Sequence, residues 1–258
     1  MTNEATIEKM RRMKLTGMAD AFQNTFTGKL DQQFSSDELI GHLIDAEWDE
    51  RYNRKLSRLI SGAKFRYQAS FEAIDYVKSR KLDKNLMLRF SNCDWVRKGE
   101  NIIITGPTGI GKSFLVSALG NQACKNGFKV IYQNAMKVFS LLKASKGDGS
   151  YINEMNRFQR CDVLIIDDFG LEILDTASRL MFFELIEDRS GTKSIVITSQ
   201  LPVPKWFEVI GDPTIADAIC DRIIHTAHKI DLDGPTMRKF YNGRKNTMPI
   251  LDETCHPD

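Results

Sequence analysis

A glycine-rich stretch, GPTGIGKS at residues 106–113, follows directly on the apolar run NIIIT at 101–105. Glycines let the backbone take conformations and close approaches that side chains obstruct, so successive N–H groups can point inward. A helix that begins just after such a turn directs the positive end of its dipole to the same place. A strand, this turn and a helix together predict a phosphate-binding loop rather than an ordinary turn.

The residue types of this loop each suit a bound nucleotide. Lys112 supplies a positive charge to the β- and γ-phosphates, and Ser113 offers a hydroxyl oxygen to Mg²⁺. The expected nucleotide-binding residues are Gly106, Pro107, Thr108, Gly109, Ile110, Gly111, Lys112, Ser113 and Phe114.

From residue 101 onward, short apolar runs alternate with stretches of helical periodicity. We expect strands over 102–105, 128–132, 163–167, 194–198 and 228–231, and helices over 112–125, 135–144, 176–189 and 214–225. This alternation predicts an α/β fold, in which a five-stranded parallel sheet and its crossover helices form a three-layer α/β/α sandwich. The segment KGDGS at 146–150 is expected to be a flexible polar loop.

Residues 1–95 have helical periodicity and no strand-like alternation. Ser35 and Glu38 have the spacing of a capping box, and apolar residues then recur mostly at steps of four. We therefore expect a small all-helical N-terminal domain over 1–95, a nucleotide-binding α/β domain over 96–246, and a loose tail over 247–258.

The composition bounds the class of protein. The 36 basic and 34 acidic residues nearly cancel, so net charge alone indicates no particular partner. The cysteines (Cys93, Cys124, Cys161, Cys220 and Cys255) form no Cys-x-x-Cys pair, so neither a disulfide framework nor a zinc site is expected. We find no apolar run of membrane-spanning length and no apolar stretch of signal-peptide type, so we expect a cytoplasmic protein without membrane contact.

A second stretch, VLIIDDFG at 163–170, ends an apolar strand with two aspartates. Ligands of such sheets gather at the carboxyl ends of the strands, so we expect Asp167 to hold Mg²⁺ together with Ser113. Asp168 could orient or deprotonate the attacking water. The alternative for each aspartate is a cap of the following turn.

Polar residues further along the chain could complete the site. The stretch SIVITSQ at 194–200 ends in polar side chains that could reach the γ-phosphate. Arg222 lies on an expected amphipathic helix and could neutralise phosphate charge in a neighbouring subunit, with an ion pair to Asp217 or Asp221 as an equal alternative. A Gly-Pro turn at 234–235 leads to Arg238, which could contact the phosphates of its own chain.

The order of these elements resembles that of AAA+ ATPases of the initiator and helicase-loader clade. In closer detail the chain is similar to the IstB-like family, ATP-dependent helpers of insertion-sequence transposition that are related to the helicase loader DnaC. The matching stretches, between about residues 10 and 240, are RRMKLTGMADAF, LIDAEWDERYNRKLSRLISGAKFR, GPTGIGKS, KGDGSY, DVLIIDDFG, EDRSGTKSIVITSQLPVPKWFEVIGDPTIADAICDRIIHTAHKIDLDG and MRK. The long sixth stretch is the most specific.

The resemblance implies an ATPase that binds ATP and Mg²⁺. It assigns the Walker A loop to 106–113, Walker B to Asp167 and Asp168, the first sensor to Gln200, the arginine finger to Arg222 and the second sensor to Arg238. Two positions depart from the family pattern: aspartate stands at 168 where many AAA+ proteins have glutamate, and Gly-Pro-Thr precedes Arg238 where Gly-Glu-Ser is usual. The first departure leaves open a nucleotide-binding scaffold without hydrolysis.

The resemblance also implies a homo-oligomer with ATP at its subunit interfaces, which assembles on duplex DNA, deforms it and recruits the transposase of the same element. Residues 51–66 contain six basic residues and no acid, which suits phosphate contacts, although a solvated helix face is the alternative. The candidate DNA contacts are Arg51, Arg54, Lys55, Arg58, Lys64, Arg66, Lys137, Lys143 and Lys146. A third basic group is Arg238, Lys239, Arg244 and Lys245.

Two further functions remain open from the sequence. A helicase loader in DNA replication would have the same nucleotide site and differ in the partner of residues 1–95. A small-molecule kinase would need an acceptor pocket and an arginine-bearing lid over the phosphates. The Asp-Asp pair and the Asp-Arg helix fit an oligomeric switch better than a kinase.

Overall fold

The structure is a computed structural model that describes residues 2–27, 34–76 and 80–237. The chain divides into two compact units, Met1–Ser61 and Gly62–Asp258. Residues 62–95, which we expected in the helical domain, thus belong to the second unit by their contacts. The expected tail at 247–258 lies outside the described residues.

The first unit consists of helices α1 (Asn3–Arg12), α2 (Thr16–Phe26) and most of α3 (Ser36–Ala63). The predicted capping box begins α3: the Ser35 N–H donates to Glu38 Oε2 at 2.8 Å, and the Glu38 N–H donates to Ser35 Oγ at 3.3 Å. The predicted apolar stripe of α3 divides between two faces. Leu43 is buried, whereas Trp48 is 73% exposed.

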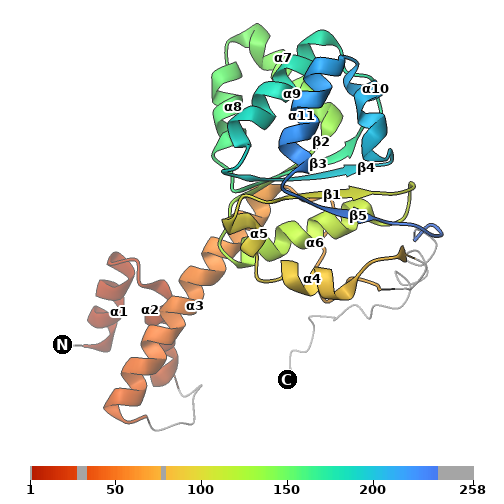
Figure 1. Cartoon of the computed structure of the whole chain (residues 1–258). Coiled ribbons are helices and arrows are strands. Elements are labelled where there is room, and N and C mark those ends of the chain that lie inside the picture. Colours follow the sequence, from red (N-terminus) through yellow and green to blue (C-terminus); the bar gives the residue numbers. More distant parts are fainter. Residues whose placement is uncertain (1, 28–33, 77–79, 238–258) are drawn as a thin grey trace, which may run out of the picture. The chain divides into compact units, whose positions relative to one another are not determined.

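The second unit is built on a parallel sheet of five strands in the order β2-β3-β4-β1-β5 (Figure 1). The strands are β1 (Asn101–Thr105), β2 (Val130–Asn134), β3 (Val163–Phe169), β4 (Ser194–Ser199) and β5 (Ala227–Asp231). The central strands read as nearly continuous apolar runs because helices cover both faces of the sheet. The predicted five-stranded parallel sheet is confirmed.

Helices cover the two faces of this sheet in separate layers (Figure 1). One layer contains α4 (Lys84–Phe90), α5 (Asp94–Arg97) and α6 (Lys112–Lys125). The other contains α7 (Ala135–Asp148), α8 (Tyr151–Gln159), α9 (Thr176–Arg189), α10 (Trp206–Ile210) and α11 (Pro213–Ile224), with the short 3-10 helix η2 (Val203–Lys205) before α10. The predicted three-layer α/β/α sandwich is thus confirmed, and the bounds of α6 and α9 agree with the sequence prediction.

The prediction of a polar loop at 146–150 is wrong. Residues 146–148 form the last turn of α7, and Gly149 ends the helix in the left-handed region at φ 78°. Ser150 then immediately precedes α8. Glycine accepts this conformation without a Cβ clash, so the glycine and serine close one helix and open the next.

Aromatic residues fix the strand that carries the two aspartates. Phe169 follows Asp168 and is buried, with its ring centroid 5.2 Å from that of Phe182 and 5.0 Å from that of Trp206. These rings pack β3 against α9 and α10. In the described part of the chain, four cysteines are free and buried, and no helix has the length and apolar character needed to cross a membrane.

Candidate nucleotide-binding site

The predicted phosphate-binding loop lies between β1 and α6. Gly106 has φ 144° and Gly111 has φ 95°, a region that favours glycine. A Cβ on Gly106 would lie 2.4 Å from the carbonyl oxygen of Leu232, so only glycine fits there. Lys112 and Ser113 are the first residues of α6, so the free N–H groups and the positive dipole end of this helix belong to the same loop. This backbone arrangement suits a phosphate group.

Lys112 is buried beneath the loop that it follows. Its Nζ donates to the carbonyl oxygens of Gly106 at 2.7 Å and Pro107 at 3.0 Å. Burial lowers the pKa of Lys112, and the negative charges of Asp168 and Asp167 oppose that shift. The ammonium group is therefore held in place by the loop and lies in the field of the carboxylate pair.

Asp167 has a fully buried side chain at the carboxyl end of β3. The Tyr132 hydroxyl donates to Oδ2 and the Thr198 hydroxyl donates to Oδ1. Burial, with the nearby Asp167 carboxylate, raises the pKa of Tyr132, which keeps the phenol protonated as a donor. Hydroxyls from the two neighbouring strands thus orient a carboxylate that is predicted to hold a metal ion.

Asp168 has an unusual backbone for a non-glycine residue, with φ 59°. The pairing of β3 with β4 shifts register between Ile166 and Phe169, and the Asp168 N–H donates to Thr198 Oγ1 at 2.9 Å. Burial and then the charge of Asp167 raise the pKa of Asp168. Strained conformations of this kind gather at functional sites.

Arg66 completes the charged cluster. Its Nη1 lies 3.3 Å from Asp168 Oδ2 and 3.8 Å from Asp167 Oδ2. We had grouped Arg66 with the candidate DNA contacts because it ends a basic run. Its partners are more than a hundred positions away in the chain, so neither local spacing nor charge patterning could have identified them.

Three other residues that we predicted for the site are not seen at this cluster: two lie elsewhere in the structure, and one lies outside the described residues. Gln200 is exposed just beyond the end of β4, and the Thr198 hydroxyl instead donates to the Asp167 carboxylate and accepts from the Asp168 N–H. Arg222 pairs with Glu187, and not with Asp217 or Asp221, because α11 packs on α9 and turns this face toward Glu187. Arg238 lies outside the described residues.

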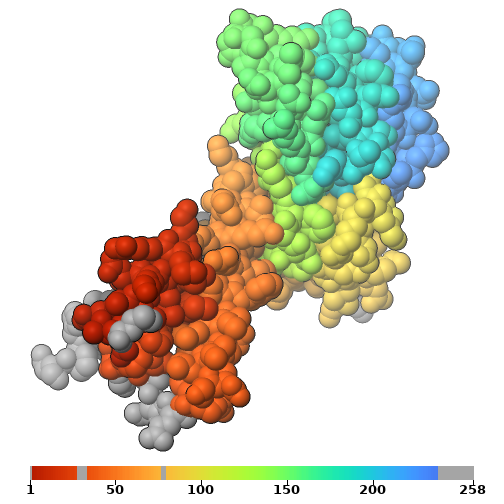
Figure 2. All heavy atoms as spheres, turned by 90° about the vertical axis from the view of Figure 1, so that its left-hand side faces the viewer, coloured from red at the N-terminus to blue at the C-terminus, as the bar shows by residue number. Residues whose placement is uncertain are grey.

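Contacts elsewhere divide the candidate DNA-binding residues into two groups. Arg51, Arg54 and Lys143 form ion pairs with Glu47, Glu50 and Asp175, respectively, and Lys146 lies over the ring of Tyr151. In the described residues, Lys55, Arg58, Lys64 and Lys137 are exposed and form no ion pair. Helix α7, which carries Lys137, is among the green atoms at the surface of the second unit in Figure 2.

The donor set is consistent with Mg²⁺ bound together with a nucleotide. In the part of the chain that the structure describes, no group of three or more His, Cys, Asp or Glu side chains could hold a metal ion. Mg²⁺ usually needs only one or two carboxylates because substrate phosphates and water supply its other oxygens. Asp167 and the Ser113 hydroxyl would be the protein ligands. Burial and two hydroxyl donors already orient the Asp167 carboxylate.

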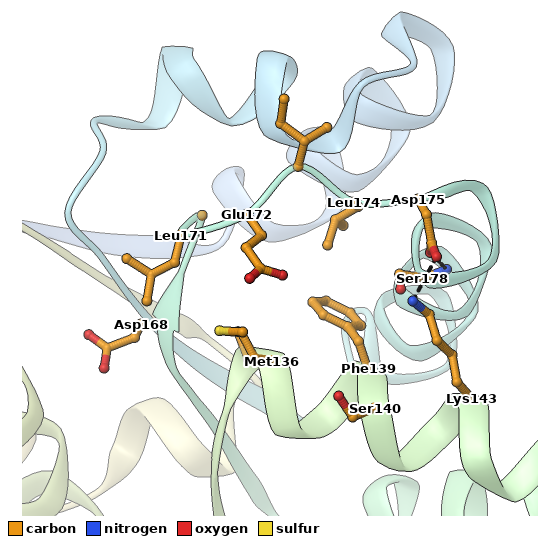
Figure 3. Close-up of a pocket in the computed structure, with 13 residues that line it drawn as sticks. Met136, Phe139, Ser140, Lys143, Asp168, Leu171, Glu172, Leu174, Asp175 and Ser178 are labelled. Carbon is orange, nitrogen blue, oxygen red and sulfur yellow. Dashed lines mark hydrogen bonds and ion pairs between the residues drawn. The ribbon is translucent and has the colours of Figure 1, made fainter.

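A cavity of about 200 Å³ opens beside Asp168, between α7 and the connection from β3 to α9 (Figure 3). Met136 and Phe139 line it from α7, and Glu172 lines it from the connection. The Asp168 carboxylate lies at its edge and points away from Phe139 and Lys143 (Figure 3). Of the charged cluster, Asp168 is thus the member that lines this cavity, and Asp167, Arg66 and Lys112 are not among its lining residues.

The loop, the carboxylate pair and the sheet order define a P-loop nucleotide-binding protein with the AAA+ fold. The model of the IstB-like ATP binding protein family matches residues 8–244. The chain belongs to this family.

Similar proteins cover nearly the whole chain. A "Putative insertion sequence ATP-binding protein" of Sinorhizobium fredii is 43% identical over 239 residues, which span 93% of this chain and 98% of the relative. The "Insertion sequence IS1162 putative ATP-binding protein" of Pseudomonas fluorescens is 36% identical over 216 residues, spanning 80% and 94%.

Solved structures share the fold at lower identity. DnaI is 20% identical with a TM-score of 0.57, covering 70% of this chain and 100% of DnaI. The DnaC helicase loader is 18% identical with a TM-score of 0.51, covering 71% and 99%. At these identities the likenesses concern the fold alone.

Proposed function

We propose that this chain is a magnesium-dependent ATPase that assembles on duplex DNA and assists the transposase of an insertion sequence. The observation that carries the proposal is the buried Asp167, which hydroxyls of β2 and β4 orient beside the loop that holds Lys112. The names of the relatives, which are insertion-sequence ATP-binding proteins, support the role in transposition.

The residues of the site would divide the chemistry between them. The loop N–H groups and Lys112 bind the triphosphate, while Asp167 and Ser113 hold Mg²⁺, which when bound neutralises charge on the phosphate oxygens. Asp168 accepts a proton from the attacking water, a task favoured by its raised pKa. The products are ADP and inorganic phosphate.

Arg222 would act on the site of a neighbouring subunit. Within its own chain the guanidinium pairs with Glu187 and lies 5.3 Å from the ring centroid of Phe183. Both of these partners lie on α9 and not in the phosphate-binding loop. The Arg222 side chain is partly exposed on α11, so a neighbouring copy could be reached from this face. A guanidinium delivered in trans is well suited to the charge that develops during phosphoryl transfer.

Mixing two variants tests this arrangement. Arg222→Ala and Lys112→Ala should each lose most ATP turnover when assayed alone. An equimolar mixture should recover part of it, because some mixed interfaces combine an intact loop from one subunit with an intact Arg222 from the other. Asp217→Ala, on the same helix and exposed, should keep wild-type turnover.

Turnover by Arg222→Ala at the wild-type rate, or a mixture no more active than its components, would reject the shared site. Binding of a fluorescent ATP analogue should persist in Arg222→Ala, because this residue completes the site without forming the loop.

DNA contact would fall on the exposed basic residues that form no ion pair, namely Lys55, Arg58, Lys64 and Lys137. Binding through phosphates should weaken steeply as the salt concentration rises. Arg51, Arg54 and Lys143 are less suited because nearby carboxylates already neutralise them.

The kinase alternative fits the site less well. Of the described residues that line the cavity beside Asp168, none is an arginine, and Lys143 already pairs with Asp175. The helicase-loader alternative would use the same nucleotide site with a different protein partner.

A further inference from the structure

The segment 64–67 follows directly on α3 and runs along the nucleotide site of the second unit. Helix α3 ends at Ala63, and Lys64 takes the left-handed conformation at φ 57°, which turns the chain out of the helix. The next three side chains, Phe65, Arg66 and Tyr67, each contact a different part of the site.

Two aromatic contacts anchor this segment. Phe65 lies against α6 so closely that a Cβ on Gly120 would be 2.4 Å from Phe65 Cε1, and its ring centroid is 6.3 Å from that of Tyr132. The Tyr67 ring centroid is 6.3 Å from that of Phe114, which follows Ser113 in α6. The backbone on both sides of Arg66 is therefore fixed relative to the phosphate loop and to the hydroxyl that holds Asp167.

Arg66 itself is only half-buried. Its side chain is 49% exposed, and its guanidinium lies 3.3 Å from Asp168 Oδ2 and 3.8 Å from Asp167 Oδ2. The cluster contains four charged groups, the two carboxylates, Arg66 and Lys112, because Lys112 also lies in the field of both carboxylates. The two positive and two negative charges balance within the protein.

A bound metal–triphosphate complex would change this balance. The proposed function assigns Mg²⁺ to Asp167, so the guanidinium and the metal ion would compete for the same carboxylate and repel each other. The complex also carries net negative charge on its phosphate oxygens, and a guanidinium matches such oxygens with parallel N–H donors. The γ-phosphate supplies oxygens that ADP lacks.

We propose that Arg66 is a γ-phosphate-sensing residue that acts within its own chain, pairing with Asp167 and Asp168 without ATP and passing to the γ-phosphate when Mg²⁺–ATP binds. This inference rests on the proposed function and adds to it a residue that distinguishes ATP from ADP.

The test compares two nucleotides on the full chain in the presence of Mg²⁺. Fluorescent ADP and a fluorescent non-hydrolysable ATP analogue are titrated against the wild type, Arg66→Ala, Arg66→Lys and Arg160→Ala. Arg66→Ala should lose roughly tenfold of the preference for the ATP analogue over ADP, the equivalent of one charge-assisted hydrogen bond, while its ADP affinity is kept. The preference of Arg66→Lys should fall between those of the wild type and Arg66→Ala, and Arg160→Ala, which changes an exposed arginine away from the site, should match the wild type.

Amide hydrogen exchange over residues 64–67 gives a second readout. In the wild type, exchange should differ between the ATP analogue and ADP, and in Arg66→Ala this difference should vanish. An unchanged analogue-to-ADP ratio in Arg66→Ala, or a wild type without any preference, would overturn the sensor. A wild type that binds neither nucleotide would instead overturn the proposed function itself.

Discussion

Lys112→Ala should reduce ATP turnover by roughly 100- to 1000-fold, the scale seen when one preorganised charge donor is removed from a transition-state site. The buried Nζ is the side-chain cation of the loop 106–113, and its bonds to the carbonyl oxygens of Gly106 and Pro107 hold it in place. Steady-state hydrolysis, with binding of a fluorescent ATP analogue measured in parallel, checks the result.

The fold should survive this change. Among the described residues, Lys112 Nζ bonds to the loop carbonyls of Gly106 and Pro107 alone, so the melting temperature should stay close to that of the wild type. Lys205→Ala, an exposed lysine in η2, is the matched control and should turn over ATP normally. Hydrolysis by Lys112→Ala at more than half the wild-type rate would show that the loop is not the catalytic site.

Arg189→Met should destabilise the second unit by about 3–5 kcal/mol, the range expected when a buried hydrogen-bonded charge is lost and its partners are left unpaired. Arg189 is fully buried at the end of α9. It donates to the carbonyl oxygens of Phe158, of Cys161 at 3.1 Å and of Ser194 at 2.8 Å. One side chain thus joins the end of α8, the turn before β3 and the start of β4.

Thermal unfolding measures the effect. For a unit of this size the expected loss corresponds to a melting temperature lower by roughly 10 °C. Arg160→Met is the matched control because Arg160 is exposed, and it should shift the melting temperature little. Arg189→Lys should recover only part of the loss, since an ammonium cannot reach all the carbonyls that the guanidinium spans. A melting temperature for Arg189→Met equal to the wild type would contradict this role.

Local chemistry explains which parts of the site could be predicted from the sequence. The loop at 106–113 combines glycines, a lysine and a hydroxyl within one turn, and the strand before it and helix after it have clear periodicity. The same holds for α6 and α9, whose predicted bounds agree with the structure. The Ser35 and Glu38 capping box is likewise a local pattern.

The parts that could not be predicted depend on contacts between distant positions. Tyr132 and Thr198 hold Asp167 only because β2, β3 and β4 are neighbours in the sheet. The polar residues at the end of β4 gave no indication of which side chain would contact Asp167. Gln200 resembled a family sensor but lies just past the strand on the exposed side. Arg66 and Arg189 find their partners through packing that no spacing rule describes.

The helix ends show the same limit on a smaller scale. The glycines and polar residues at 146–150 suggested an open loop, but Gly149 ends one helix and Ser150 begins the next without an intervening segment. Glycine is equally common in loops and at helix ends, so composition could not separate these outcomes.

The central claim is that ATP at the loop controls assembly on duplex DNA, and sedimentation velocity of the full chain with a short duplex tests it most directly. With Mg²⁺ and a non-hydrolysable ATP analogue, the protein and DNA should sediment together as a large complex. With ADP that complex should dissociate into smaller species. A chain that stays monomeric and separate from the DNA with either nucleotide would contradict the account.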